Sequence, residues 1–431
     1  MMPAIRSTAP RTSGSPRAVV LDSRIPALVL RVAPNIFHHG TLGVLRSLGR
    51  AGIEVHAMLE GDDVPAARSR YVHRRYPVPA STDEPHLLEV LHRIGEQIGR
   101  RALLVTVDDL GAIFVARHAA ALRQFFLLPD QPPDLPRLVA DKASLIDVCA
   151  QSAVPHPQTL RPRSAHDAAA AVERFGLPLI AKWSRPWESA PTPTALLHTV
   201  EEVQRTYALG SMGGGELLLQ RRVPPAPGSD WFFHGYFDAA SRCLFGAAGR
   251  KERAYPPQTG LTTLGRWLPN SALEAHAQRL AAGLGYSGVL DLDFRFDRET
   301  GEYYLLDFNP RLGAQFRLFT DHQGLDMVRA QHLDLTGREV PPVQPRYGRA
   351  FLVENYDPVS AAIQVWQRRL SLPECRRSLQ GVRELAWWSR DDPRPALAML
   401  PRWCGACYRR LRAGSEAVAA VPVTPGVSDG G

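Results

Sequence analysis

The sequence predicts a mixed α/β protein that contains more than one domain. Three observations support this prediction: a length of 431 residues, an amino-terminal alternation of β-rich apolar runs with helical patterns, and a later pair of strand patterns joined by a short turn. The apolar fraction of 45% and the charged fraction of 22% are typical of a chain that buries a core, and they do not fit a disordered protein.

Residues 26–136 are expected to form an α/β domain with a parallel sheet. Apolar runs at 26–32, 53–59 and 102–109 predict strands, with helical patterns between them. Such sheets bind ligands at the carboxyl ends of their strands. The polar residues at these ends are Asn35, His38, His39, Asp108 and Asp109. Turn and capping roles account for the same residues, so both interpretations stay open. No G-x-G-x-x-G motif follows the first strand, which disfavours a nicotinamide enzyme.

A second α/β pattern begins near residue 137. Helices are expected at about 137–151, 194–209 and 273–283. Strands are expected at 179–183, 215–223, 230–238, 243–255, 287–297 and 302–310. The last two strands are joined by a short turn and therefore predict a hairpin.

This hairpin, DLDFRFDRETGEYYLLDFNPR at 291–311, is the most informative stretch of the chain. Side chains alternate between the two faces of a strand, and by this count Asp293 and Asp307 point to the same face of the hairpin. Asn309, two residues after Asp307, points to that face as well. Two carboxylates and an amide oxygen form a hard-oxygen site that suits Mg²⁺ bound together with phosphate oxygens. Arg311 continues the same parity and is a candidate for holding an anion. Solvated acids on an ordinary hairpin are the alternative, but the apolar neighbours would make unpaired acids costly there.

Lysine is rare in this chain. Of 51 basic residues only Lys142, Lys182 and Lys251 are lysines, and the other 48 are arginines. Compositional bias explains most of the arginine excess. A compact ammonium charge differs from a planar guanidinium as a phosphate ligand, however, and the three lysines are therefore candidate phosphate contacts.

The order and spacing of these features resemble the ATP-grasp superfamily of carboxylate–amine ligases, in particular its D-aspartate ligase-like branch. The matching segments are ADK at 140–142, LIAK at 179–182, QRRVPPAPGSD at 220–230, GRKERAYPP at 249–257 and the acidic hairpin. The resemblance implies an ATP-grasp fold with an amino-terminal Rossmann-like domain at 26–136. It further implies an ATP-grasp domain at 137–345 with a lid at about 179–223, and a helical extension at 346–412. Residues 1–25 are expected to be a flexible leader and 413–431 a disordered tail.

The resemblance also implies roles for individual residues. Lys142 and Lys182 match the lysines that approach the nucleotide phosphates, and Lys251, Arg253 and Arg311 match basic residues at the phosphate or acyl-phosphate site. The implied nucleotide-binding residues are Leu219, Gln220, Arg221, Arg222 and Asp230. The implied metal ligands are Asp293, Asp307 and Asn309.

The implied activity is ATP-dependent amide bond formation between a carboxylate and an amine through an acyl phosphate. ATP and Mg²⁺, with Mn²⁺ as an alternative, are the implied cofactors. Asp307 and Gln220 stand where most members of the superfamily have Glu. These departures favour the alternative reading, a non-catalytic ATP-grasp protein that binds nucleotide.

The remaining features of the sequence are less specific. No run of about eighteen apolar residues is present, and five cysteines do not form a disulfide scaffold, so a cytoplasmic protein is expected. Small-molecule substrates are the expected partners, without nucleic acid or membrane, and a homodimer stays open. The basic segment at 68–76 and the C-x-x-C at 404–407 fit a solvated surface and chance helix cysteines better than a nucleic-acid or zinc site.

Overall fold

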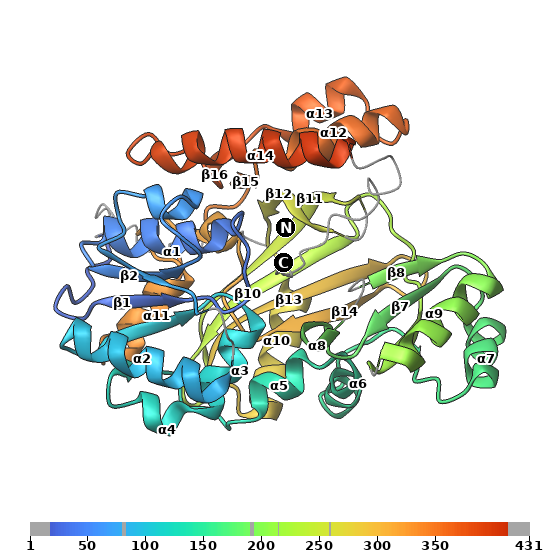
Figure 1. Cartoon of the computed structure of the whole chain (residues 1–431). Coiled ribbons are helices and arrows are strands. Elements are labelled where there is room, and N and C mark those ends of the chain that lie inside the picture. The colour runs from blue at the N-terminus through green and yellow to red at the C-terminus, as the bar shows by residue number, and fades with distance from the viewer. Residues whose placement is uncertain (1–17, 80–82, 190–193, 214, 258–259, 413–431) are drawn as a thin grey trace, which may run out of the picture.

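A computed structural model describes residues 18–79, 83–189, 194–213, 215–257 and 260–412 of the chain. The described residues form three β-sheets, with helices packed around them (Figure 1). The predicted leader (apart from residues 18–25) and the predicted tail lie outside these ranges. Among the helices of the described residues, none combines the length and apolarity needed to cross a bilayer.

The first sheet is parallel and has five strands in the order β3-β2-β1-β4-β5. Its strands are β1 (Ala27–Leu30), β2 (Val55–Leu59), β3 (Arg74–Pro77), β4 (Ala102–Thr106) and β5 (Phe126–Leu127). Its helices are α1 (His39–Arg50), η1 (Pro65–Arg68), α2 (Glu84–Ile98), α3 (Asp109–Arg117) and α4 (Ala119–Leu122). The alternation of strands and helices expected for this region is therefore confirmed.

The smallest sheet has four strands in the order β6-β9-β7-β8. Its strands are β6 (Thr159–Leu160), β7 (Leu179–Trp183), β8 (Thr194–Leu197) and β9 (Leu217–Arg221), and its helices are α7 (Ala165–Phe175), α8 (Pro186–Ser189) and α9 (Val200–Gly213). The expected helix at 194–209 is wrong at its start, because β8 pairs antiparallel with β7 and buries Leu197 against Leu179. Tertiary packing here overrides the local helical pattern.

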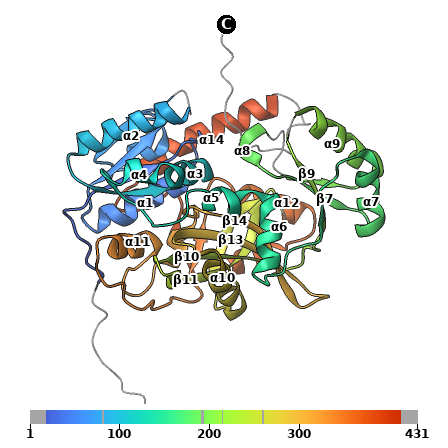
Figure 2. The same cartoon turned by 90° about the horizontal axis from the view of Figure 1, so that it is seen from below.

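The central sheet has seven strands in the order β14-β13-β10-β11-β12-β15-β16. They are β10 (Asp230–Phe237), β11 (Cys243–Tyr255), β12 (Leu261–Trp267), β13 (Gly288–Asp297), β14 (Glu302–Asn309), β15 (Ala350–Leu352) and β16 (Val382–Leu385). The helices packed around it are α5 (Leu135–Ala140), α6 (Lys142–Gln151), α10 (Ser271–Leu284), η2 (Phe316–Phe319) and α11 (Met327–Leu335). It lies between the other two sheets (Figure 2).

The helix expected at 137–151 is two helices. Asp141 has an extended backbone, and its side chain accepts hydrogen bonds from the backbone N–H groups of Ala143 and Ser144. Such a cap satisfies donors at the start of a helix that have no partner within it. The break therefore places Lys142 at the first position of α6, where its side chain is free to reach the central sheet.

The carboxyl-terminal helices α12 (Asp357–Trp366), α13 (Leu372–Ser378) and α14 (Arg394–Arg412) lie along one side of the molecule (Figure 1). Two short strands, β15 and β16, come from the same region and complete the central sheet, so the region is not wholly helical. Arg46 of α1 is fully buried and donates hydrogen bonds to the Asp392 carboxylate and to the Trp387 carbonyl. These contacts fix the carboxyl-terminal region to the first sheet.

Candidate active site

Three acidic side chains and one amide form a two-by-two block on β13 and β14. Asp293 lies opposite Asp307 in the strand register, and Asp291 lies opposite Asn309. Because side chains alternate along a strand, all four residues project from one face of the sheet. The amide nitrogen of Asn309 donates to the Asp291 carbonyl at 3.1 Å, which leaves its amide oxygen as an acceptor.

The three lysines of the chain meet this block from three different elements. Lys142 at the start of α6 forms an ion pair with Asp307, and Lys182 on β7 approaches the same carboxylate to 3.6 Å. Lys251 on β11 is 2.7 Å from Asp293. The structure therefore brings together every lysine and both candidate metal-binding carboxylates.

The proximity of opposite charges shifts the pKa values of these groups. Burial acts to raise the pKa of Asp307, but Lys142 and Lys182 outweigh it and lower that pKa to about 2. Burial lowers the pKa of Lys182 to about 8, and Asp307 opposes this shift only in part. For Asp293, burial together with the nearby carboxylates of Asp291 and Asp307 outweighs Lys251 and raises the pKa. The block is therefore a crowded set of partly buried charges that shift one another's pKa values.

Arg311 joins the block to the first sheet. Its guanidinium is 2.5 Å from Asp291 and 3.6 Å from Asp109, which is the first residue of α3. His234 on β10 lies opposite Asp291, with its Nε2 3.1 Å from the carboxylate. Sequence reasoning did not include Asp291 or His234 in the site. Asp291 lies two residues before Asp293, so strand alternation alone would have placed its side chain on the same face.

The donor set of the block fits a magnesium ion. Carboxylate and amide oxygens are the ligands that Mg²⁺ prefers, and one or two carboxylates together with phosphate oxygens are its usual environment. Asp293, Asp307 and the free oxygen of Asn309 supply these atoms from two adjacent strands.

The predicted nucleotide-binding residues lie on β9 and on the segment that leads to β10. Leu219 is fully buried, and the Gln220 side chain donates a hydrogen bond to Thr159. Arg221 pairs with Asp297 at 3.2 Å. The segment continues through the half-buried Arg222 to Asp230, which pairs with Arg295 at 2.5 Å. These residues connect the four-stranded sheet to the central sheet. Asp230 also acts on the block: burial tends to lower the pKa of Lys251, but Asp293 and, to a smaller extent, Asp230 outweigh it and raise that pKa.

Arg253 is not brought to the block, contrary to the expectation that it faces the phosphate site. Register shifts on β11 near Lys251 and Arg253 separate the directions of the two side chains. The Arg253 guanidinium is buried and donates to both carboxylate oxygens of Asp357, at 2.8 and 2.7 Å. This pair ties β11 to α12, so its observed contacts are structural.

The polar residues at the strand ends of the first sheet divide into two groups. His38 accepts a hydrogen bond from the Thr41 N–H, and Asp108 accepts from the N–H groups of Val32, Ala33 and Gly111, so these two residues are caps. Asp109 instead faces Arg311. Only Asp109 of this pair of acids therefore contributes its charge to the site.

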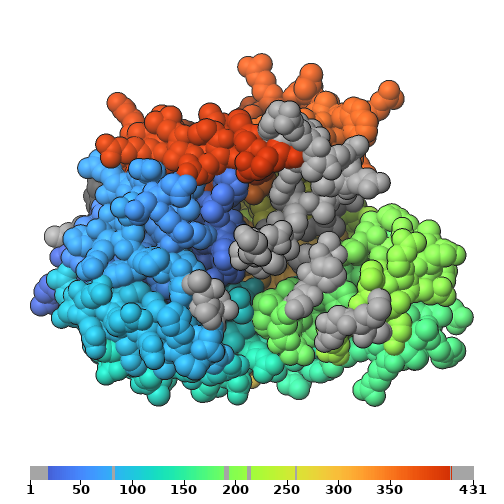
Figure 3. Space-filling view, in the orientation of Figure 1, coloured from blue at the N-terminus to red at the C-terminus, as the bar shows by residue number. Residues whose placement is uncertain are grey.

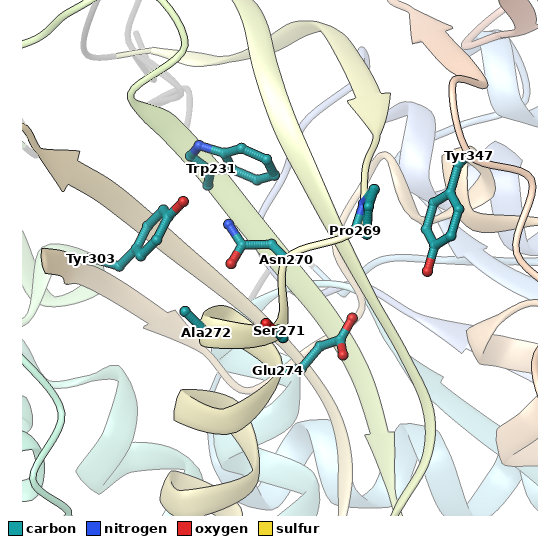
Figure 4. Close-up of a pocket in the computed structure, with 8 residues that line it drawn as sticks. All are labelled: Trp231, Pro269, Asn270, Ser271, Ala272, Glu274, Tyr303 and Tyr347. Carbon is teal, nitrogen blue, oxygen red and sulfur yellow. The ribbon is translucent and has the colours of Figure 1, made fainter. Parts of the chain in front are cut away.

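A separate concavity of about 540 Å³ lies at the start of α10 (Figure 4). Trp231, Tyr303, Tyr347 and Glu274 are among its lining residues. None of the predicted site residues lines it, so it does not belong to the charged block.

No known family model matches the chain. The chain is 21% identical to the D-aspartate ligase of Enterococcus faecium over 325 residues, which cover 71% of this chain and 76% of that protein. It is also similar in structure to an L-amino acid ligase from Bacillus licheniformis, with a TM-score of 0.57 and 14% identity over 77% of this chain and 79% of the other. N5-carboxyaminoimidazole synthetase from Staphylococcus aureus has a TM-score of 0.57 and 12% identity, covering 78% and 82% of the two chains.

The chain has the ATP-grasp fold. The resemblance inferred from the sequence motifs is thereby confirmed at the level of the fold. The charged block lies where the four-stranded sheet meets the central sheet, since Lys182 on β7 approaches Asp307 on β14. Figures 1 and 2 show these two sheets next to each other.

Proposed function

We propose that the protein is an ATP-dependent ligase that joins a carboxylate to an amine. The observation that carries the proposal is the convergence of Lys142, Lys182 and Lys251 on Asp293 and Asp307. Phosphoryl transfer requires several negative charges to be held close together, and positively charged side chains with a metal ion make that possible. The similarity to a D-aspartate ligase and to an L-amino acid ligase supports the same reaction class.

The reaction takes place in two steps. An oxygen of the substrate carboxylate attacks the γ-phosphorus of ATP, the bond to the β-phosphate oxygen breaks, and ADP leaves behind an acyl phosphate. The amine nitrogen then attacks the acyl carbon, the carbon–oxygen bond to phosphate breaks, and inorganic phosphate leaves as the nitrogen loses a proton. An acyl phosphate is needed because a free carboxylate is a poor electrophile.

The residues of the block have distinct proposed roles. Lys142 and Lys182 hold nucleotide phosphates, while Lys251 and Arg311 hold the transferred phosphoryl group or the substrate carboxylate. Asp293, Asp307 and Asn309 hold a magnesium ion, which would neutralise phosphate charge when bound. Lys142 and Lys251 also form ion pairs with Asp307 and Asp293, which balances the charges of these partly buried groups.

The nucleotide base is proposed to lie beside Leu219–Arg222, with Asp230 near the ribose. The segment 179–223 is the proposed lid, because it forms most of the four-stranded sheet and could cover the acyl phosphate from water. The proposed domain limits are 26–136, 137–345 and 346–412. Arg253 is left out of the catalytic group because its Nε and Nη2 already donate to Asp357 and its Nη1 donates to the Ser378 hydroxyl.

Phosphate release tests this proposal. The full chain is mixed with ATP, Mg²⁺ and pools of amino acids and other small carboxylates and amines, and phosphate is measured with and without each pool. Release that requires both an acid and an amine, with mass spectrometry showing the amide, supports the ligase. If calorimetry shows that MgATP binds but no pair of substrates releases phosphate, the protein is the non-catalytic nucleotide-binding alternative that Asp307 and Gln220 favour.

A further inference from the structure

The net charge of the chain is concentrated in its carboxyl-terminal region. Residues 366–412 contain eleven arginines and four acidic residues, which amounts to +7 of the chain's total of +8. The rest of the protein is therefore close to neutral, and any long-range attraction for an anionic partner comes from this region.

The four acidic residues in this region are already engaged elsewhere. Asp392 pairs with the buried Arg46, and Asp391 pairs with Arg50. Glu384 binds Arg317 and Arg349, and Glu374 caps α13 through Ser371. Most of the arginines thus lack an acidic neighbour that could neutralise them.

The exposed arginines cluster around α13. Arg368, Arg369, Arg376 and Arg377 are all exposed, and the nearby Glu374 carboxylate is engaged by Ser371. Arg394 and Arg409 on α14 are also exposed. Side chains of this region project from the top of the molecule in the space-filling view (Figure 3).

Large apolar side chains are exposed in the same region. Trp366 is 83% exposed, Leu372 is 72% exposed, and Leu397 and Leu400 are 64% and 58% exposed. Single exposed apolar residues are common, but several large ones gathered in one region indicate a surface that binds a partner. We define the exposed parts of 366–379 and of α14 as the basic apolar surface.

The helix α14 has two apolar sides with different environments. Its inner side is docked, since Trp403 contacts Phe37 and Tyr356 at ring distances of 5.5 and 4.6 Å. Leu397 and Leu400 lie on its outer side and stay exposed. Exposed leucines beside arginines are also the side chains by which interfacial helices bind a membrane surface.

We propose that the basic apolar surface docks on an anionic phospholipid bilayer, in the plane of the interface. Arginines near such a surface are attracted to lipid phosphates, and Trp366 and the leucines enter the boundary of the acyl chains. A second copy of the chain is a poor occupant, because two surfaces with the same strong positive charge would repel each other. Nucleic acid would satisfy the arginines but would leave the exposed leucines without an apolar partner. This proposal revises the expectation that the protein has no membrane partner, and it does not depend on the ligase proposal.

Vesicle flotation of the full chain tests the proposal. The protein is expected to float with vesicles that contain phosphatidylglycerol and not with vesicles of phosphatidylcholine alone, and added NaCl should weaken the binding. The double variant Arg376→Glu, Arg377→Glu should lower the partition coefficient at least about tenfold. Trp366→Ala should lower it several-fold without a change in charge.

A charge-matched control separates local docking from the effect of net charge. Arg93 and Arg205 are exposed on α2 and α9, away from the basic apolar surface, and the variant Arg93→Glu, Arg205→Glu has the same total charge as the test variant. The control should float like the original chain, and all variants should unfold at the same urea concentration. Equal losses in the control and test variants would overturn the proposal. Equally strong binding of double-stranded DNA that Trp366→Ala does not weaken would also overturn it, because the occupant would then be an acidic polymer.

Discussion

Asp293 and Asp307 face each other across the paired strands β13 and β14, and each is neutralised by lysines that arrive from outside that hairpin. Two carboxylates in this arrangement repel each other unless cations lie between or beside them. The protein meets this requirement with side chains from α6, β7 and β11. A hairpin of β13 and β14 alone would therefore not make the site.

Two variants of Asp307 should show whether its negative charge is needed for metal binding and for activity. Asp307→Asn is expected to lower ATP-dependent phosphate release by about 100-fold or more, because it removes a metal ligand and the counter-charge of two lysines. Asp307→Glu keeps the charge and should retain most of the activity. Phosphate release and calorimetry of MgATP binding measure both effects. Full activity of Asp307→Asn would contradict the proposed metal site.

The buried His39 should make the fold sensitive to mild acid. Burial, with a smaller effect of Arg317, lowers the pKa of His39 to about 3, so the folded state keeps the imidazole neutral. The unfolded chain binds a proton near the ordinary pKa of about 6.5, so stability is lost as the pH falls from that value towards 3. This residue alone should cost about 2 kcal/mol of unfolding free energy between pH 7 and pH 5.

Urea unfolding at both pH values checks this expectation. Other buried histidines shift stability in the same direction, so the informative quantity is the difference between the original chain and His39→Gln. The variant should lose about 2 kcal/mol less than the original chain between pH 7 and pH 5. An identical loss in both proteins would show that His39 does not remain neutral in the fold.

The neighbouring residues Asp391 and Asp392 offer a comparison of exposed and buried ion pairs. Asp392→Ala leaves the guanidinium of Arg46 buried without its counter-charge and should destabilise the protein by about 3–5 kcal/mol. Asp391→Ala removes a half-exposed pair with Arg50 and should cost about 1 kcal/mol or less. Urea midpoints at neutral pH measure both. A similar cost for the two variants would argue against the buried pair as the attachment of the carboxyl-terminal region.

Gly313 has no room for a side chain. A Cβ atom there would lie 2.2 Å from His234 Cε1 and 3.0 Å from the Asp291 carboxyl carbon. Because His234 is fully buried and cannot move aside, Gly313→Ala should cost about 1–3 kcal/mol and should also reduce phosphate release by displacing Arg311. Gly283→Ala on α10 is the control, since its nearest neighbour would be the Ser152 hydroxyl at 3.3 Å. A loss of stability with unchanged activity would mean that Asp291 does not position Arg311.

The sequence predicted the structure best where the contacting residues lie close together along the chain. The opposition of Asp293 and Asp307 follows from strand parity across a short turn, and the strand–helix alternation of the first sheet follows from apolar periodicity. The convergence of the lysines could be anticipated only through the resemblance to known ATP-grasp proteins, because Lys142 and Lys251 are 109 residues apart in the sequence.

Contacts between residues that lie far apart along the chain could not be predicted from the sequence. The burial of Arg253 depends on Asp357, 104 positions later, and no local pattern connects the two. The prediction of a helix starting at residue 194 was wrong because β8 pairs with β7 in a sheet. The local apolar pattern does not reveal that pairing. The strands β15 and β16 are too short to be distinguished from loops before their partner β12 is known.

The pairing of Arg46 with Asp392 has a consequence for protein synthesis. Arg46 leaves the ribosome early, but its counter-charge is made 346 residues later. Until Asp392 has been translated, the Arg46 guanidinium on α1 has no carboxylate to pair with. The strand β12 likewise lies at the edge of the central sheet until β15 and β16 have been made. The packing of α1 is therefore complete only after residue 392 has been translated, and a chain truncated before that residue should be more vulnerable to proteases.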